Sequence, residues 1–144
     1  MRFVIAADDD ADVVTEIASF LSARGHTVTR LEKATWGQVA LEVGRRVASG
    51  HDDQGVVLCF TGTGVSMAAN KVPGVRAALC VDAETAAGAR RWNDANVLAL
   101  SLRLLTTTLA AEIMEAWLGT VYAGTEADSL AAMARIDATA TAPS

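Results

Sequence analysis

Short apolar runs alternate with amphipathic stretches along the whole chain, and this alternation limits the fold more than any other feature. Each apolar run predicts a buried strand, and each stretch with an apolar residue every three or four positions predicts a helix. Strands are expected at residues 2–7, 27–31, 56–60, 75–81 and 97–102, and helices at 13–24, 36–49, 66–71, 83–92, 108–118 and 127–136. Since parallel strands need helical crossovers, we predict an α/β fold: a single three-layer Rossmann-like (flavodoxin-like) domain with a five-stranded parallel sheet.

The length of the chain suits one such domain. A chain of 144 residues has room for one hydrophobic core. We expect the domain to cover residues 1–137 and residues 138–144 to form a flexible C-terminal tail. Because the last helix is apolar and Trp117 lies in the helix before it, we expect the C-terminal helix to be used in dimerisation.

Helix caps set several of these boundaries. Thr35 is followed three positions later by Gln38, the pattern of a capping box, and the helix that begins there is expected to turn Trp36 and Val39 inward. Asp82 is the expected N-cap of the helix at residues 83–92.

Composition excludes several kinds of partner and site. The chain has 12 basic and 17 acidic residues, a net charge of −5, so neither a nucleic-acid groove nor an anionic membrane surface is expected. No segment is long and apolar enough to span a membrane, and two cysteines in the whole chain fit free thiols in the cytoplasm. His26 and His51 lack neighbouring ligands, so we expect no metal and no cofactor.

The carboxyl ends of parallel strands are where such sheets bind ligands. We place Asp8, Asp9, Cys59, the glycine-rich turn at 61–64 and the turn at 93–96 at this edge of the sheet. The glycine-rich turn lacks the Lys of a P-loop and the third glycine of a dinucleotide site. It is either a tight turn that needs glycine or a cradle of amide groups for an anion or oxyanion.

Cys59 precedes this turn, and two interpretations of it stay open. A thiol beside a helix N-terminus can be a reactive thiolate, whereas most free cysteines are inert core residues. Cys80, in the next strand along the chain, is expected to be a core thiol.

Several segments together resemble one enzyme family. Residues 59–71 (CFTGTGVSMAANK), 72–80 (VPGVRAALC), 93–100 (NDANVLAL) and 116–118 (AWL) resemble the type B ribose-5-phosphate isomerase and galactose-6-phosphate isomerase family. The resemblance extends over roughly residues 2–122. It implies a Rossmann-like domain without a metal, assembled as a homodimer or dimer of dimers with active sites shared between subunits.

The resemblance also implies an aldose–ketose isomerisation through a cis-enediolate. It makes Cys59 the base, with Thr61 and Asp8 assisting ring opening and proton transfer between hydroxyl groups. The remaining site residues are substrate-binding groups: the amides of Gly62, Thr63, Gly64, Val65 and Ser66, which hold the oxyanion, and the side chains of Asn93 and Arg103.

The chain departs from the family pattern at the phosphate end of the site. Asp9 and Trp92 stand where the family has histidines, and Phe60 stands where it has glycine. Beyond Arg103 the only basic residue is Arg135. Since carboxylates repel a phosphate dianion, we predict an isomerase, or a closely related epimerase, that acts on an atypical sugar without a phosphate group, with Asp9 and Trp92 lining its pocket.

Two alternatives remain open at this point. The chain is a catalytically impaired subunit or binding protein that needs a paralogous partner carrying the missing residues. Or it is an ordinary ribose-5-phosphate isomerase whose phosphate is held by Arg90 or Arg91.

Overall fold

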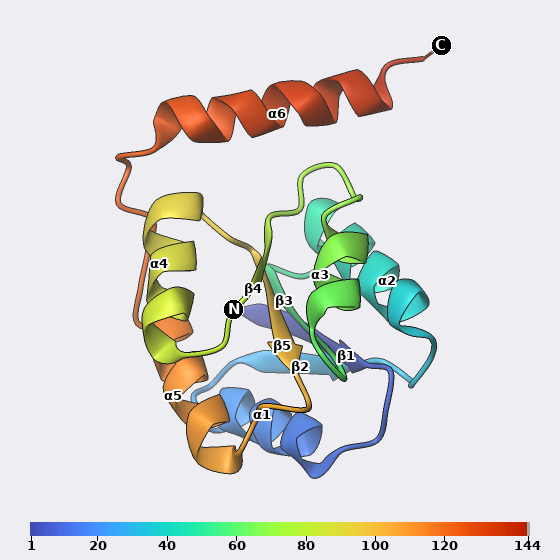
Figure 1. The fold of residues 1–144 in the computed structure, drawn as a ribbon, viewed down its shortest axis with the longest axis vertical. Helices are drawn as coiled ribbons and strands as arrows, with labels where there is room; N and C mark the ends of the chain where they lie inside the picture. Colours follow the sequence, from blue (N-terminus) through green and yellow to red (C-terminus); the bar gives the residue numbers. More distant parts are fainter. Residues whose placement is uncertain (144) are drawn as a thin grey trace.

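Five parallel strands form one sheet in the order β2-β1-β3-β5-β4 (Figure 1), in a computed structural model that describes residues 1–143. The strands are β1 (Arg2–Ala7), β2 (Thr27–Arg30), β3 (Gln54–Cys59), β4 (Ala77–Leu79) and β5 (Val97–Ser101). The central strands β3 and β5 are buried along their whole length. The predicted α/β fold with a five-stranded parallel sheet is confirmed.

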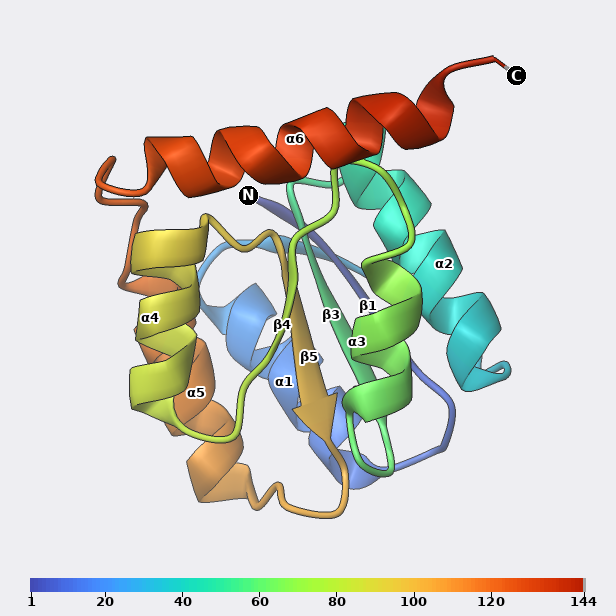
Figure 2. The same cartoon turned by 45° about the horizontal axis from the view of Figure 1, so that its top comes forward.

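Helices cover both faces of the sheet, as crossovers of one hand require. They are α1 (Asp12–Ala23), α2 (Trp36–Ala48), α3 (Thr63–Ala69), α4 (Ala83–Asn93), α5 (Thr107–Leu118) and α6 (Ala127–Thr141). Helices α1, α4 and α5 pack on one face, around Phe3 and Ile5, while α2 and α3 pack on the other, around Val4 and Ala6. Helix α6 crosses the end of the sheet where the strands begin (Figure 2). None of the helices described is both long enough and apolar enough to cross a membrane.

The predicted caps hold in the structure. Thr35 and Gln38 form the complete capping box, and the side chain of Asp82 accepts the Thr85 amide at 2.7 Å. The inward orientation expected for Trp36 is wrong, because as the first residue of α2 it lies outside the core and is 48% exposed.

Two predicted boundaries differ from the structure. Strand β4 is short because the Arg76 amide donates to the side chain of Asn96 instead of a strand. Helix α6 runs to Thr141, so residues 138–141, expected in a flexible tail, are helical. The hydroxyl groups of Thr139 and Thr141 bond to carbonyls four residues earlier, which supports this last turn.

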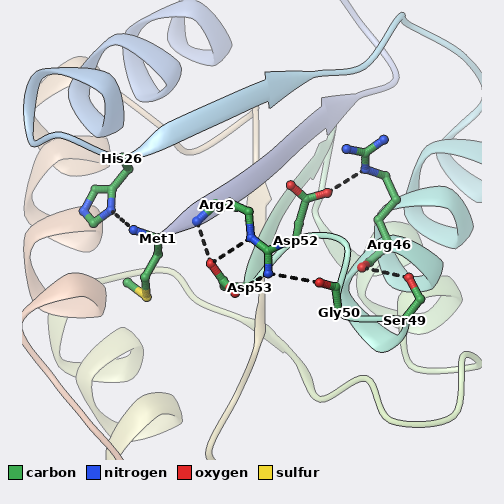
Figure 3. Close-up of polar contacts among 8 residues, drawn as sticks. All are labelled: Met1, Arg2, His26, Arg46, Ser49, Gly50, Asp52 and Asp53. Carbon is green, nitrogen blue, oxygen red and sulfur yellow. Dashed lines mark hydrogen bonds and ion pairs between the residues drawn. The ribbon is translucent and has the colours of Figure 1, made fainter.

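Polar contacts join neighbouring segments of the chain at the edge of the sheet where the strands begin (Figure 3). Arg2 pairs with Asp53 at 2.8 Å and also donates to the carbonyl of Gly50. Hydrogen bonds from Arg2 lower the pKa of Asp53 to about 2. The terminal amine of Met1 lies 3.2 Å from Nδ1 of His26, whose pKa is lowered first by burial and then by that ammonium group.

Candidate active site

Cys59 is the last residue of β3 and faces the turn that follows it. Its Sγ accepts a hydrogen bond from the amide of Gly62 at 3.2 Å, and its side chain is 5% exposed. The other cysteine, Cys80, packs in the core on the opposite face of the sheet from Cys59, and burial raises the pKa of its thiol to about 12. Cys80 is therefore a core thiol, and Cys59 is the sulfur that faces the turn.

Gly62 is the residue that shapes this turn. It has a left-handed conformation with φ of 77°, which favours glycine. A Cβ atom at Gly62 would lie 2.5 Å from Cδ1 of Leu79 and 2.9 Å from the carbonyl carbon of Leu100. The turn therefore needs glycine both for its conformation and for its close approach to β4 and β5.

The backbone amides of residues 62–66 fall into two groups: those that hold the turn together and those that are available to a ligand. The Gly62 amide donates to the Cys59 sulfur, and the Ser66 amide donates to the Gly62 carbonyl within the first turn of α3. Within residues 1–143, the amides of Thr63, Gly64 and Val65 make no hydrogen bond. These are the donors of the predicted oxyanion cradle that the fold leaves available.

The chain after β5 holds the turn in place. The amides of Leu102 and Arg103 donate to the carbonyls of Cys59 and Phe60, each at 2.9 Å, and the Ser101 hydroxyl also donates to Phe60 at 3.0 Å. Ser101 was not predicted as part of the site, and only the pairing of Cys59 with Ser101 in the sheet reveals it. The Arg103 side chain is exposed and has no ion-pair partner among residues 1–143.

Carboxylates from the β1–α1 loop occupy the same edge. The Asp8 amide donates to the carbonyl of Leu58, which places Asp8 beside β3. Burial raises the pKa of the Asp8 carboxyl group, and the charge of Asp9 raises it further. Asp10 is turned toward Lys33, whose Nζ lies 2.6 Å from its carboxylate, and this ion pair lowers the pKa of Asp10. Lys33 is a cation at this edge that the sequence patterns did not reveal.

Side chains of the turn itself also lie at the carboxyl edge of the sheet. The hydroxyl groups of Thr61 and Thr63 lie 2.7 Å apart and share a hydrogen bond. Phe60 is 67% exposed and leaves its ring at the surface of the turn. Cys59, Thr61, Asp8, Asp9 and Arg103 are therefore all brought to one edge of the sheet.

Trp92 and Asn93 lie elsewhere, and the predicted place of the 93–96 turn is wrong. Helix α4 runs against the strand direction, so its last residues reach the edge where β5 begins, opposite Cys59. Asp94 follows with φ of 46°, and its carboxylate pairs with Arg76 at 3.2 Å and Arg90 at 3.7 Å. Arg90 is bound there, so it cannot hold a phosphate beside Cys59 of the same chain.

A groove of about 1260 Å³ lies at this second edge, between α4, β4 and α6. Trp92 and Asn93 line it together with apolar side chains of α6. Helix α6 is tied across it by a hydrogen bond from the Gly74 amide to Asp137 at 2.9 Å. Among residues 1–143, no group of His, Cys, Asp and Glu side chains could hold a metal ion.

A model of the Ribose/Galactose Isomerase family matches residues 3–134. The chain belongs to this family. Ribose-5-phosphate isomerase B of Escherichia coli strain K12 is 40% identical over 116 residues, which cover 76% of each chain. D-erythrulose-4-phosphate isomerase of Pectobacterium atrosepticum is 37% identical over 131 residues, 86% of each chain.

Solved structures in the Ribose/Galactose Isomerase family share the fold. Ribose-5-phosphate isomerase B of Clostridium thermocellum has a TM-score of 0.91 and 37% identity, over 96% of this chain and 99% of that one. The enzyme of Mycoplasma genitalium, solved with bound ribulose-5-phosphate, has a TM-score of 0.90 and 32% identity, over 95% of this chain and 96% of that one. The family expected from the sequence is confirmed: this is a sugar-phosphate isomerase of carbohydrate metabolism.

Proposed function

We propose that the chain interconverts an aldose phosphate and its ketose through a cis-enediolate, with Cys59 as the base. The observation that carries this proposal is the position of the Cys59 sulfur, 3.2 Å from the Gly62 amide at the start of a turn with three free amides. A donor aimed at the sulfur stabilises negative charge there, and free amides nearby suit an oxyanion.

The reaction needs a proton moved between neighbouring carbons. The Cys59 thiolate takes the proton from C2, and the electron pair of that bond forms the C1–C2 double bond as O1 becomes an oxyanion. The amides of Thr63, Gly64 and Val65 hold this charge; a preorganised donor of this kind contributes about 3–4 kcal/mol. Asp8 and Thr61 pass the O2 proton to O1, and Cys59 returns its proton to C1.

Asn93 and Trp92 would enter this site from a second copy of the chain. In one chain they lie opposite Cys59, yet Asn93 and Trp92 are both exposed beside a groove with apolar walls. Exposed Met133 and Ile136 extend this apolar edge along α6. We propose a homodimer, or a dimer of dimers, in which each site combines Cys59 of one subunit with Asn93 of the other.

Arg103 is the group we assign to the phosphate. Its side chain is exposed at the carboxyl edge and has no ion-pair partner within residues 1–143. The relatives described above are named for sugar phosphates, which favours a phosphorylated substrate over the uncharged sugar expected from Asp9 and its neighbours. A catalytically impaired subunit that needs a paralogous partner is the outcome that the following experiment would show as no deuterium exchange with any of the sugars.

The test is proton exchange in deuterated water, followed by NMR on four-, five- and six-carbon sugars with and without a phosphate. We expect deuterium to enter the carbon next to the carbonyl of a sugar phosphate, and Cys59→Ala to abolish it. Cys80→Ala is the matched control and should retain exchange, because that thiol packs in the core on the opposite face of the sheet from Cys59. Exchange that survives Cys59→Ala would refute Cys59 as the base, and exchange only with free sugars would refute the phosphate assignment.

A further inference from the structure

Trp36 is an exposed aromatic side chain beside the turn that follows Cys59. It is the first residue of α2, and the capping box of Thr35 and Gln38 fixes where that helix begins. The core face of α2 begins with Val39, so the indole is left outside the core with 48% of its surface exposed. Because α2 begins at the carboxyl edge of the sheet, the indole lies at the same edge as Cys59.

The indole is packed against Gly64. A Cβ atom built on Gly64 would lie 3.0 Å from Cδ2 and 3.0 Å from Cε3 of the Trp36 ring. The φ angle of Gly64 is outside the left-handed region, so its backbone conformation does not require glycine. The ring lies so close to Gly64 that a side chain there would displace it, and the ring thereby borders the segment that carries the free amides of Thr63, Gly64 and Val65.

We propose that Trp36 is a substrate-contacting residue that forms a side wall of the Cys59 site and receives the carbon face of the sugar. This inference deepens the function proposed above and rests on it. Amides and hydroxyl groups of the turn can bind sugar oxygens, but they offer nothing to the C–H groups of the carbon chain. An aromatic ring supplies that surface, since its electron-rich face attracts the positive edges of C–H bonds.

The kinetic test compares Trp36→Ala with Trp36→Phe on the sugar phosphate that the enzyme turns over. Trp36→Ala should raise KM about tenfold with a smaller change in kcat, which corresponds to about 1.4 kcal/mol of lost binding. Trp36→Phe should recover most of the affinity because it keeps a ring. Val121→Ala, which removes an exposed side chain from the loop after α5, is the control and should leave KM unchanged. A KM that Trp36→Ala leaves unaltered would overturn the proposal.

A binding measurement separates this inference from the proposed reaction. The indole N–H resonances of the three tryptophans can be assigned with single Trp→Phe variants and followed as four-, five- and six-carbon sugar phosphates are added in turn. A shift of the Trp36 indole together with the amides of residues 63–65 supports the side wall even without turnover. Shifted amides with an unmoved Trp36 indole refute it even if turnover is normal, and no shift at all refutes both.

A double variant tests the geometry. Gly64→Ala should weaken substrate binding while Trp36 is present, since the new methyl group displaces the ring. In the Trp36→Ala background the same change should cost little further affinity. Strictly additive effects of the two changes would contradict contact between the ring and Gly64.

Discussion

The amide of Gly62 donates a hydrogen bond at 3.2 Å to the sulfur of Cys59, three positions earlier in the chain. The last residue of a buried strand and the cap of the next helix are thereby locked together. The left-handed conformation of Gly62 aims this amide back at the sulfur rather than along α3. The hydrogen bond to the Cys59 sulfur consequently depends on the backbone conformation of one glycine.

Replacing Gly62 by Ala should reduce kcat about a hundredfold or more, in the range seen when one preorganised donor is lost. The added methyl group would meet the backbone of Leu100, so the amide must move away from the sulfur. Proton exchange by NMR measures the loss. Gly50→Ala is the matched control, because Gly50 also has a positive φ of 75° but no atom within 4 Å of a Cβ. Equal losses of activity in both variants would mean that strain alone explains the effect.

Changing Asp9 to Asn should move the acid limb of kcat/KM to lower pH. Burial and the charge of Asp9 both raise the pKa of Asp8, so removing that charge lowers it. If Asp8 works as a carboxylate, activity is present above its pKa and is lost as pH falls through it. A pH–rate profile of the two proteins measures the shift. Asp10→Asn should leave the limb in place because Asp9, and not Asp10, is the charge that raises the pKa of Asp8; an unmoved limb in Asp9→Asn would contradict the role of Asp8.

Mixing two inactive variants should restore activity if sites are shared. A subunit with Cys59→Ala and one with Asn93→Ala form a heterodimer with one intact site, so random mixing should recover about a quarter of the wild-type rate. Unfolding the mixture, refolding it and assaying turnover measures the recovery. Mixing Cys59→Ala with Thr61→Ala should recover nothing, since both residues come from one subunit. Recovery in neither mixture would argue that each chain supplies its whole site.

Stability should fall as the pH is lowered through the usual titration range of histidine. The pKa of His26 is lowered in the folded state by burial and by the Met1 ammonium group, so the unfolded chain binds the proton more readily. The His26 contribution is therefore complete above a pH of about 6.5 and is lost below it. Urea unfolding at several pH values should show that the free energy of unfolding depends less steeply on pH for His26→Gln than for wild type. His51→Gln, at an exposed position, is the control. If His26→Gln leaves this pH dependence unchanged, His26 is excluded as its source.

Local patterns predicted the elements well. The run from Arg2 to Ala7 is a strand over the whole predicted length, and the caps at Thr35 and Asp82 are formed as expected. These features depend on residues close together in the chain, so a single sequence contains the information.

Features that depend on distant residues escaped prediction. Helical periodicity predicted that Trp36 faces the core. The first residue of a helix need not continue the core face, and the Trp36 ring packs against Gly64 instead. The pairing of Lys33 with Asp10 joins loops after different strands. The 93–96 turn was misplaced because the direction of the preceding helix, not the residues of the turn, decides which edge it reaches.

Helix α6 contributes no side chain to either core cluster, and none of its residues from Ala127 to Thr141 is buried. The hydrophobic interior is complete once Leu118 is in place. Folding of the domain therefore need not wait for the C-terminus, and α6 can settle after the core has formed. For the homodimer proposed above, this order means that each chain would fold first on its own, and association would follow as a later, concentration-dependent step.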